Sequence, residues 1–501
     1  MAHGALPRAY SAIICSIYVI FSSFFRFFSV LLLPLQPQTI KTDEMMRKLL
    51  FSTLLALAAT SAVHAGGLMT NTNYHIAFDR MFARGASTEI DAAYSNPAGL
   101  VWGHEGFQLS LNFQKPWQNR DIEASIPGYL GSNFDKKYNG VASAPIVPAL
   151  FASYKKDMWA FSAMIGIVGS GGFVKYDEGI PMFEVPIRAL LAQAGMTPDK
   201  YNYSANMKGK QYIYGGQLNI TRKINDNFSA AIGIRANYYD GYNRGFVNAN
   251  MTAVPNHIDL IDLQLDCIQR GWGFAPIVSF DYHNDNLTVS ARYEFRTKIA
   301  TENDTRTLSA RIKNTDPATA AAIPYIEGAL ALQQFGDKVA AYQDGAETRY
   351  DMPSLLAVAV GYDFTPQLRA ALEYHFFDDK HAKMAGNRQK TLTHGTHEIL
   401  AGVEYDINEK FTVSCGGQRT DYGLSDDYQQ NTSFACDSYS LGLGGAWNIT
   451  EKMRLNVSYF CSLYSDYKTA PKAKYNGTPY TGTETYSRSN HVIGVGLDYK
   501  F

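Results

Sequence analysis

The feature that most constrains this chain is a series of segments in which apolar and polar residues alternate. Clear examples are 228–238, 287–296, 368–376 and 453–459, where apolar residues share one face and charged or polar residues share the other. A period of two with charge on one side is typical of a β-strand between two different media. A soluble sandwich also alternates, but these segments run about ten residues and carry aromatics near their ends, as tilted membrane strands do.

Helical membrane insertion is excluded for most of the chain. Beyond residue 65 no run of eighteen consecutive apolar residues occurs, so any insertion there must use strands. The chain is rich in Tyr (33), Phe (28) and Gly (41), yet its mean hydropathy is only −0.20. Strands with polar residues toward a lumen give such an average, although a large soluble all-β protein would also do so.

Turns and loops give a strand count. Short polar turns are predicted at 155–157, 225–227, 284–286, 365–367, 408–410 and 450–452, where Asn, Asp or Pro suits a tight reversal. Long loops are predicted at roughly 116–146, 170–206, 241–266, 299–346, 379–393, 421–435 and 465–487. Six short turns and seven loops predict an all-β protein: an antiparallel transmembrane β-barrel of fourteen strands over 105–501, with the short turns periplasmic.

The final strand supports this prediction independently. Residues 493–501 alternate, and the strand ends on Phe501 with Tyr499 two residues before it. This ending resembles the signal read by the barrel-assembly machinery, which we expect as a partner during biogenesis. Outer-membrane lipids and lipopolysaccharide are the other expected partners.

The first 65 residues contain an export signal. A basic start at 46–48 precedes an apolar stretch, and 63–65 fit the small-x-small cleavage rule, which predicts a signal peptide at 46–65 and export to the bacterial outer membrane. We interpret 1–45 as an upstream extension from an early start codon. The alternative is a transmembrane anchor at 12–35.

The segment 66–104 is not strand-like. About forty residues are too few to form a core of their own, so they must fold against something larger. A barrel lumen is available, and we therefore predict that this segment is a plug, or hatch, inside the barrel.

Here the sequence resembles the FadL family, the outer-membrane transporters of long-chain fatty acids and aromatic hydrocarbons. The resemblance rests on the triplet Asn96, Pro97 and Ala98, on the run 84–91 before it, on the hairpin at 353–374, on the strand number and on the aromatic carboxy terminus. It implies passage of small hydrophobic molecules through a hatch-filled barrel, with sideways exit into the bilayer and no enzymatic activity or cofactor.

The resemblance also implies that the triplet holds the hatch near an inward kink of the third strand, which we predict at roughly 158–168. Pro97 suits a turn that needs no amide donor, and Asn96 is expected to cap nearby backbone groups. Glycines weaken a strand ladder, so the candidates for the kink are Gly166, Gly169, Gly171 and Gly172. The alternative is that these glycines begin a loop.

Two groups of residues are candidates for ligand contact. Phe78, Met81, Phe82 and Leu100 are expected to line a pocket or, alternatively, to pack the hatch on the barrel wall. Three arginines should point into the lumen by alternation, where they attract a carboxylate or form salt bridges that pin the plug: Arg235, Arg292 and Arg369.

Two long loops are expected to contain helices, at 183–194 and 318–342. They form an apolar groove where a ligand first lands, or they pack together and close the barrel mouth.

Other functions are less well supported by the sequence. The alternatives are a general diffusion porin, which would lack a plug, and a receptor for haem or another aromatic ligand. No nucleophile motif or metal-binding spacing occurs, and the balance of 45 basic to 46 acidic residues gives no indication of nucleic acid. Whether disulfides join the four cysteines after residue 65 is open: Cys267, Cys415, Cys436 and Cys461.

Overall fold

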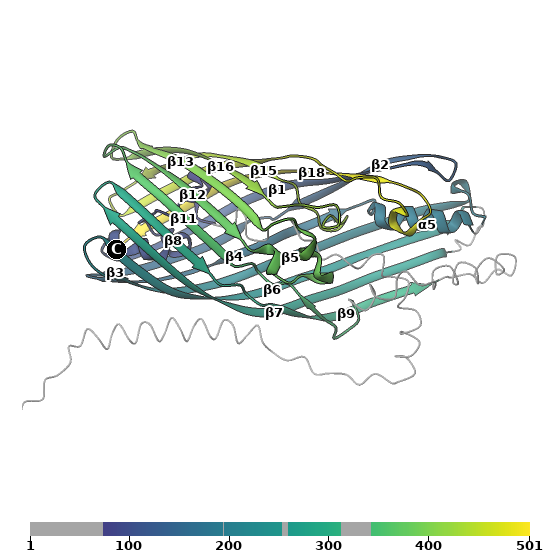
Figure 1. The fold of residues 1–501 in the computed structure, drawn as a ribbon, viewed down its shortest axis with the longest axis horizontal. Coiled ribbons are helices and arrows are strands. Elements are labelled where there is room, and N and C mark those ends of the chain that lie inside the picture. The colour runs from purple at the N-terminus through teal and green to yellow at the C-terminus, as the bar shows by residue number, and fades with distance from the viewer. Residues whose placement is uncertain (1–73, 194, 253–258, 312–341) are drawn as a thin grey trace, which may run out of the picture. The chain divides into compact units, whose positions relative to one another are not determined.

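The computed structural model describes residues 74–193, 195–252, 259–311 and 342–501. Within this part of the chain all strands belong to one sheet, and β1 (Gly106–Tyr129) pairs with β18 (Thr483–Lys500) on one side and with β2 and β3 on the other. The sheet is therefore a closed antiparallel barrel (Figure 1). Closure removes the exposed edges that a membrane cannot accommodate.

The described strands form fourteen spans, as predicted. Three spans are each divided by a short irregular segment into β2 and β3, β8 and β9, or β10 and β11, and β17 is a short piece within a loop. Between β1 and β18 the strands are β2 (Ser132–Ser143), β3 (Val147–Lys156), β4 (Trp159–Tyr176), β5 (Tyr201–Lys223), β6 (Phe228–Met251), β7 (Asp259–Asn284), β8 (Leu287–Glu294), β9 (Ala300–Arg311), β10 (Glu347–Arg349), β11 (Leu355–Asp363), β12 (Leu368–Phe377), β13 (Thr396–Asp406), β14 (Phe411–Asp421), β15 (Ser438–Asn448), β16 (Met453–Tyr464) and β17 (Tyr467–Lys468).

The described helices are few and short, and none is long and apolar enough to cross a membrane. Before the barrel lie α3 (Ile76–Met81), α4 (Ala92–Ser95) and the 3-10 helix η2 (Pro97–Trp102). The others lie between strands: α5 (Pro181–Gln193), η3 (Pro198–Lys200), η4 (Asp379–His381), η5 (Ala385–Thr391) and η6 (Tyr475–Gly477).

All six short turns occur where the sequence predicts them. Local side-chain hydrogen bonds explain why these residues reverse the chain. The Asn225 side chain accepts from the backbone N–H groups of Asn227 (3.0 Å) and Phe228 (2.9 Å). Asn408 does the same at its own turn, where it accepts from the backbone N–H of Lys410 at 2.9 Å.

The predicted loops at 116–146 and 241–266, and the first part of the loop at 299–346, are wrong in large part, because strands occupy most of them, whereas strands occupy only the two ends of the loop predicted at 170–206. At the first of these, only Leu130 and Gly131 separate β1 from β2, both with positive φ, as a tight hairpin turn requires. Strands of up to 26 residues are far longer than the ~10 residues that cross a membrane.

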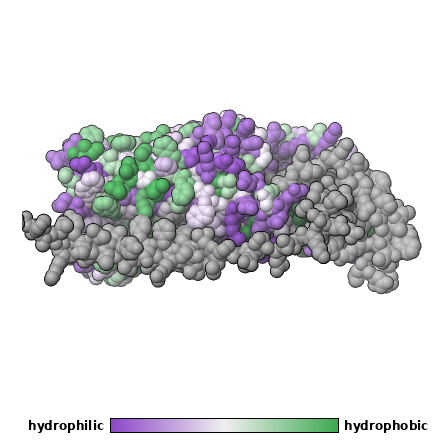
Figure 2. Space-filling view, turned by 90° about the horizontal axis from the view of Figure 1, so that it is seen from below, coloured by the Kyte–Doolittle hydropathy of each residue, from purple (hydrophilic) through white to green (hydrophobic). Residues whose placement is uncertain are grey.

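The polarity of the two strand faces reverses along these long strands. Near the short turns, Leu218 and Ile220 of β5 point outward and Asn219 points into the lumen. Farther along the same strand Lys208 lies on the outer face, whereas Met207 is buried inside. Figure 2 shows the same change, with hydrophobic residues toward the end that carries the C terminus and hydrophilic residues beyond them. The strands were predicted too short because the prediction assumed that the apolar residues stay on one face along the whole length of a strand.

Candidate functional site

The hatch, described here for residues 74–104, folds inside the lumen. Its helices α3, α4 and η2 are almost completely buried. One side of the hatch packs on a cluster that includes Met164 and Val168 of β4, and the other side packs on Leu400 and Phe460. The lumen at this level is therefore filled by a packed core.

Helix α3 lies directly on the barrel wall. Glycines of three neighbouring strands leave room for its backbone: Gly402 of β13, Gly416 of β14 and Gly442 of β15. A Cβ atom at Gly416 or Gly402 would overlap the carbonyl oxygen of Met81. This close approach requires glycine, and the three positions together form a seat for the hatch.

The Asn96 to Ala98 triplet is bonded to the barrel wall. The Asn96 side-chain amide donates to Asp281 Oδ2 (3.0 Å), and the backbone N–H of Ala98 donates to Ser279 Oγ (3.1 Å). The Pro97 carbonyl accepts from the hydroxyl of Thr221 on β5 (2.8 Å), and that of Ala98 accepts from the hydroxyl of Ser229 on β6 (2.7 Å).

These bonds correct the expectation that Asn96 caps nearby backbone groups, and they show which strands hold the triplet. The Asn96 side chain caps no backbone group of the helix that follows it. The hydrogen bonds of the triplet go to β5, β6 and β7, and none goes to the third span, β4. A buried amide beside a carboxylate gains more from bonding that carboxylate than from a local cap, because a buried carboxylate without donors is costly.

Charge pairs join the hatch to the wall at several points. Arg80 of α3 forms a fully buried ion pair with Glu404 of β13, and Arg369 of β12 binds the same carboxylate. Arg84 binds Asp91 within the hatch at 2.6 Å and also Glu89. Glu89 in turn binds Arg454 of β16 at 2.6 Å.

A second group of charges surrounds Tyr94. The guanidinium of Arg235 lies 5.2 Å from the centre of its ring and forms an ion pair with Glu294. Arg292 lies 5.4 Å from the same ring and donates to the Tyr94 carbonyl. All three arginines named from the sequence thus point inward. Arg235 and Arg369 form ion pairs with carboxylates of the barrel wall, and Arg292 donates to a carbonyl of the hatch.

The four apolar ligand candidates do not form one pocket. Phe78 and Phe82 contact each other, and Phe82 contacts Phe460 of β16 edge to face. Leu100 belongs to a different cluster, and Met81 lies on the glycine seat. Their contacts in this structure are with the wall, which was the alternative interpretation; ligand contact stays a prediction.

The wall of the barrel is interrupted between its second and third spans. The ladder with β4 runs from the turn as far as Leu150 paired with Ile165, and resumes at Ala142 paired with Val174. Between these points the described residues 143–149 and 166–173 form no ladder pairs with each other. We call this interruption the wall gap.

Both sides of the wall gap have residues that weaken pairing. Pro145 and Pro148 lack an amide proton. On β4 the four predicted glycines lie within a continuous strand, so they do not begin a loop. Its pairing with β5 shifts register between Ile167 and Gly169 and again between Ser170 and Gly172. Such bulges bend a strand.

The wall gap is apolar. Ala144 and Val147 from one side and Ile167 from the other form a small cluster of buried residues. Tyr74 at the start of the described hatch and Tyr212 of β5 pack against this cluster. The hatch, the gap and the bilayer side of the wall are therefore adjacent.

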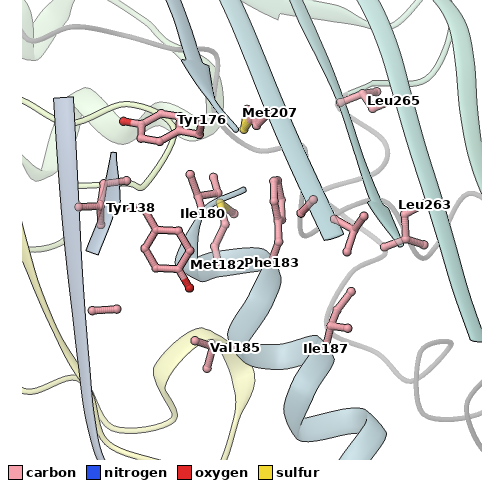
Figure 3. Packing of buried hydrophobic residues seen from close by; sticks show 14 of the residues in the cluster. Tyr138, Tyr176, Ile180, Met182, Phe183, Val185, Ile187, Met207, Leu263 and Leu265 are labelled. Carbon is pink, nitrogen blue, oxygen red and sulfur yellow. The ribbon is translucent and has the colours of Figure 1, made fainter. Parts of the chain in front are cut away.

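The outer part of the barrel contains a second, larger apolar cluster. Helix α5 confirms the helix predicted at 183–194, and its residues Met182, Phe183 and Val185 are buried there. Figure 3 shows α5 among the strands, with Tyr138 on one side and Leu263 on the other. The helix packs among the strands of the outer barrel; closure of the mouth by two helices packed together stays a prediction. The second predicted helix, at 318–342, lies almost entirely outside the described residues.

Comparisons with known proteins agree with this geometry. Residues 308–501 match the family model described as outer membrane protein beta-barrel domain. A FadL homologue from Pseudomonas aeruginosa matches with a TM-score of 0.61 at 15% identity, over 87% of this chain and all (100%) of that chain. The toluene transporter TodX from Pseudomonas putida matches with a TM-score of 0.52 at 11% identity, over 88% of this chain and 100% of that chain. No curated protein matches the sequence.

The chain has the FadL fold. It is a β-barrel protein of the bacterial outer membrane, as predicted. The four cysteines are free thiols in this structure. Among the described residues no group of His, Cys, Asp and Glu side chains is arranged to hold a metal ion.

Within this FadL fold, sequence reasoning found the triplet, the inward arginines and the glycines of β4. It missed the opposite side of the wall gap. The available signal was the pair Pro145 and Pro148 within an otherwise alternating segment, because proline is rare in the interior of a paired strand. It also missed the glycine seat of α3, since those glycines become neighbours only when three strands pair.

Proposed function

We propose that the protein carries small hydrophobic molecules, such as long-chain fatty acids or aromatic hydrocarbons, across the outer membrane. The molecule enters at the mouth, passes the hatch and leaves sideways through the wall gap into the bilayer. The observation that carries the proposal is the wall gap itself, which is apolar, unpaired and in contact with the hatch.

Sideways exit suits an apolar cargo for a physical reason. Each CH₂ group that enters water costs ~0.8 kcal/mol, so a hydrophobic chain gains by moving from one apolar surface to another. The lumen at the hatch is lined by ion pairs and packed helices, which offer no continuous apolar route straight through. A gap in the wall opens instead toward hydrocarbon.

The same geometry argues against an open diffusion pore. The described hatch is buried in the lumen and is bonded to β5, β6, β7, β13 and β16. A water-filled channel needs a lumen free of such a core. The similar structures include that of a toluene transporter, which supports a hydrophobic cargo for this chain.

Uptake of a radiolabelled long-chain fatty acid and of toluene by cells that express the protein tests the proposal. Ala144→Asp places a carboxylate in the wall gap. Ala446→Asp places the same group on β15, where the ladders on both sides are continuous. The two alanines are matched, since both are buried with 6% and 5% exposure.

We expect Ala144→Asp to reduce uptake at least about tenfold, because a charge in an apolar passage costs well over 1.4 kcal/mol. Ala446→Asp should retain most of the uptake. Gel mobility with and without heating shows that both variants fold and insert. Equal uptake by the two variants, or passage of small sugars into liposomes, contradicts the proposal.

A further inference from the structure

Three cations lie side by side on the outer face of the barrel, beyond the apolar part of its wall. Lys175 of β4 is paired in the ladder with Lys208 of β5, and Lys208 is paired with Arg244 of β6. The three side chains point outward, because residues next to them in the strands, such as Val174 and Met207, are buried inside. We call these three residues the cationic row.

A band of aromatic side chains lies between the cationic row and the apolar part of the wall. Its members on the outer faces of β5, β6 and β7 are Tyr212, Tyr214, Tyr238 and Trp272. The rings of Tyr238 and Trp272 pack together, with 4.6 Å between their centres. Aromatic residues of membrane barrels gather at the level of the lipid head groups. The band therefore marks the boundary of the hydrocarbon at the end of the barrel away from the short turns.

The height of the cationic row above this band indicates which lipid it meets. Lys208 lies four residues beyond Tyr212 on β5, which is about 13 Å along the strand and about 10 Å in height at the usual tilt. The head groups of phospholipids extend only about 5–8 Å beyond the hydrocarbon. A lipid that reaches the row therefore needs a larger head group, with negative charge farther from the hydrocarbon.

Carboxylates of the chain compensate the cationic row only in part. Like charges directly opposite each other destabilise a sheet. Lys175 binds Asp177 at 2.5 Å, and Arg244 binds Asp266 through Nε at 2.8 Å. Lys208, in the middle, forms no ion pair within the described ranges. Because partly exposed ion pairs contribute little, the row retains positive charge that a further anion can neutralise.

The outer face of the neighbouring strands β1 and β2 has the opposite charge. Asp121 lies four residues beyond the exposed Trp117 of β1, so its height corresponds to that of Lys208. Glu123 follows on the same face, and Lys137 of β2 binds Asp121 at 3.0 Å. The cationic row is therefore a local feature of β4, β5 and β6, which a general preference for basic residues at this height does not explain.

We propose that the cationic row binds a phosphate group on the sugar head of lipopolysaccharide, and that the acyl chains of this lipid lie against the apolar outer face of β5 and β6. Guanidinium and ammonium groups bind phosphate through charge-assisted hydrogen bonds. Below the row, Leu218 and Ile234 are paired in the ladder and exposed, as contact with acyl chains requires. Tyr212 also packs against the apolar cluster of the wall gap, so the bound lipid lies beside the gap. The site is outside the lumen and does not depend on the proposed function.

Binding to the purified full-length protein in a nonionic detergent tests the site. The probes are fluorescently labelled lipopolysaccharide and the same lipopolysaccharide after chemical removal of its phosphate groups. We expect the phosphorylated form to bind at least about tenfold more tightly, and the difference to shrink at high salt. Equal affinity of the two forms overturns the proposal. Displacement of the lipid by inorganic phosphate at an equal phosphate concentration indicates a site for the free ion and also overturns it.

Variants locate the site. Arg244→Gln should weaken binding of the phosphorylated form about tenfold and leave binding of the phosphate-free form unchanged, whereas Arg244→Lys should retain part of the affinity. Lys208→Gln breaks no ion pair of the chain and should weaken binding about fivefold.

The matched control is Lys137→Gln on the outer face of β2. Lys137 and Arg244 are 48% and 40% exposed, and each binds an aspartate of the neighbouring strand. We expect the control to bind lipopolysaccharide as the unchanged protein does. Gel mobility with and without heating shows that every variant is folded before binding is measured. Equal weakening by Lys137→Gln and Arg244→Gln means that overall charge attracts the lipid, and this result overturns the site.

Discussion

The inner and outer halves of the barrel interior are built from opposite chemistry. The inner half, within the membrane level, contains buried ion pairs such as Arg80 with Glu404 and Arg235 with Glu294. The outer half contains an apolar core around α5, with residues such as Phe183 and Tyr138. The same strands line both halves.

The difference shows how one long strand can face lipid along one part of its length and water along the other. Where the outer face meets lipid, the inner face must take the polar residues, and these then need partners from the hatch. Where the outer face meets water, the inner face is free to form an ordinary hydrophobic core. Side chains continue to alternate between the inner and outer faces along the whole strand, but the outer face changes from apolar to polar. Leu218 and Lys208, both on the outer face of β5, show this change.

The largest expected effect comes from breaking a buried charge pair of the inner half. Glu404→Ala leaves Arg80 without its carboxylate in a fully buried position. We expect a loss of about 3–5 kcal/mol in the free energy of unfolding. Urea unfolding in detergent, followed by gel mobility, measures this loss of stability. The control is Glu409→Ala, in an exposed turn. Equal midpoints for both variants contradict the importance of the inner charge pairs.

The matching test of the outer half removes an apolar side chain. Leu191 of α5 is fully buried in the outer cluster. Leu191→Ala should destabilise the packing of α5 by about 2–5 kcal/mol through lost burial and a cavity. Limited proteolysis between β4 and β5 should become faster, whereas the gel mobility of the barrel should be retained. Unchanged proteolysis would show that the helix contributes little to closing the mouth.

A charge placed at two heights on one strand face tests the reversal of polarity directly. Leu218 and Ser204 lie on the outer face of β5. Leu218→Arg should cost about 2–4 kcal/mol, because arginine then faces hydrocarbon. Ser204→Arg should cost almost nothing, since that height faces water. Refolding yields into lipid vesicles distinguish the two, and similar yields would contradict the assigned membrane level.

The smallest expected effect concerns the seat of the hatch. Gly416→Ala forces a methyl group against the Met81 carbonyl, whereas Gly417→Ala, the next residue, has no atom within close range. We expect a cost of about 1–3 kcal/mol for the first and a negligible cost for the second. Hydrogen exchange of the α3 backbone amides measures this loss of local stability in each variant. Faster exchange in both variants alike would show that the seat is not specific.

The barrel could be predicted from the sequence because each turn and each alternating segment can be recognised from neighbouring residues alone. Six turns with Asn, Asp, Thr or Pro and segments of period two were sufficient to count fourteen spans. The lengths of the spans could not be predicted in the same way. The first 24 residues of the barrel form one strand, but its apolar face changes sides, and a search for one apolar face ends halfway.

The candidate site was only partly predictable. The triplet at Asn96 and the inward position of Arg292 follow from sequence pattern, yet their partners do not. Asp281 lies 185 positions from Asn96 in the chain. The wall gap likewise depends on how far two ladders continue, which is a property of pairing between strands.

By itself the sequence determined which residues alternate, where the chain turns and that a hatch precedes the barrel, because each of these depends on neighbouring residues. Only the tertiary structure decided where the wall opens, which arginines are neutralised and that Lys175, Lys208 and Arg244 form one row. Those features arise when strands far apart in the chain pair, and the register of that pairing is set by the closed barrel as a whole.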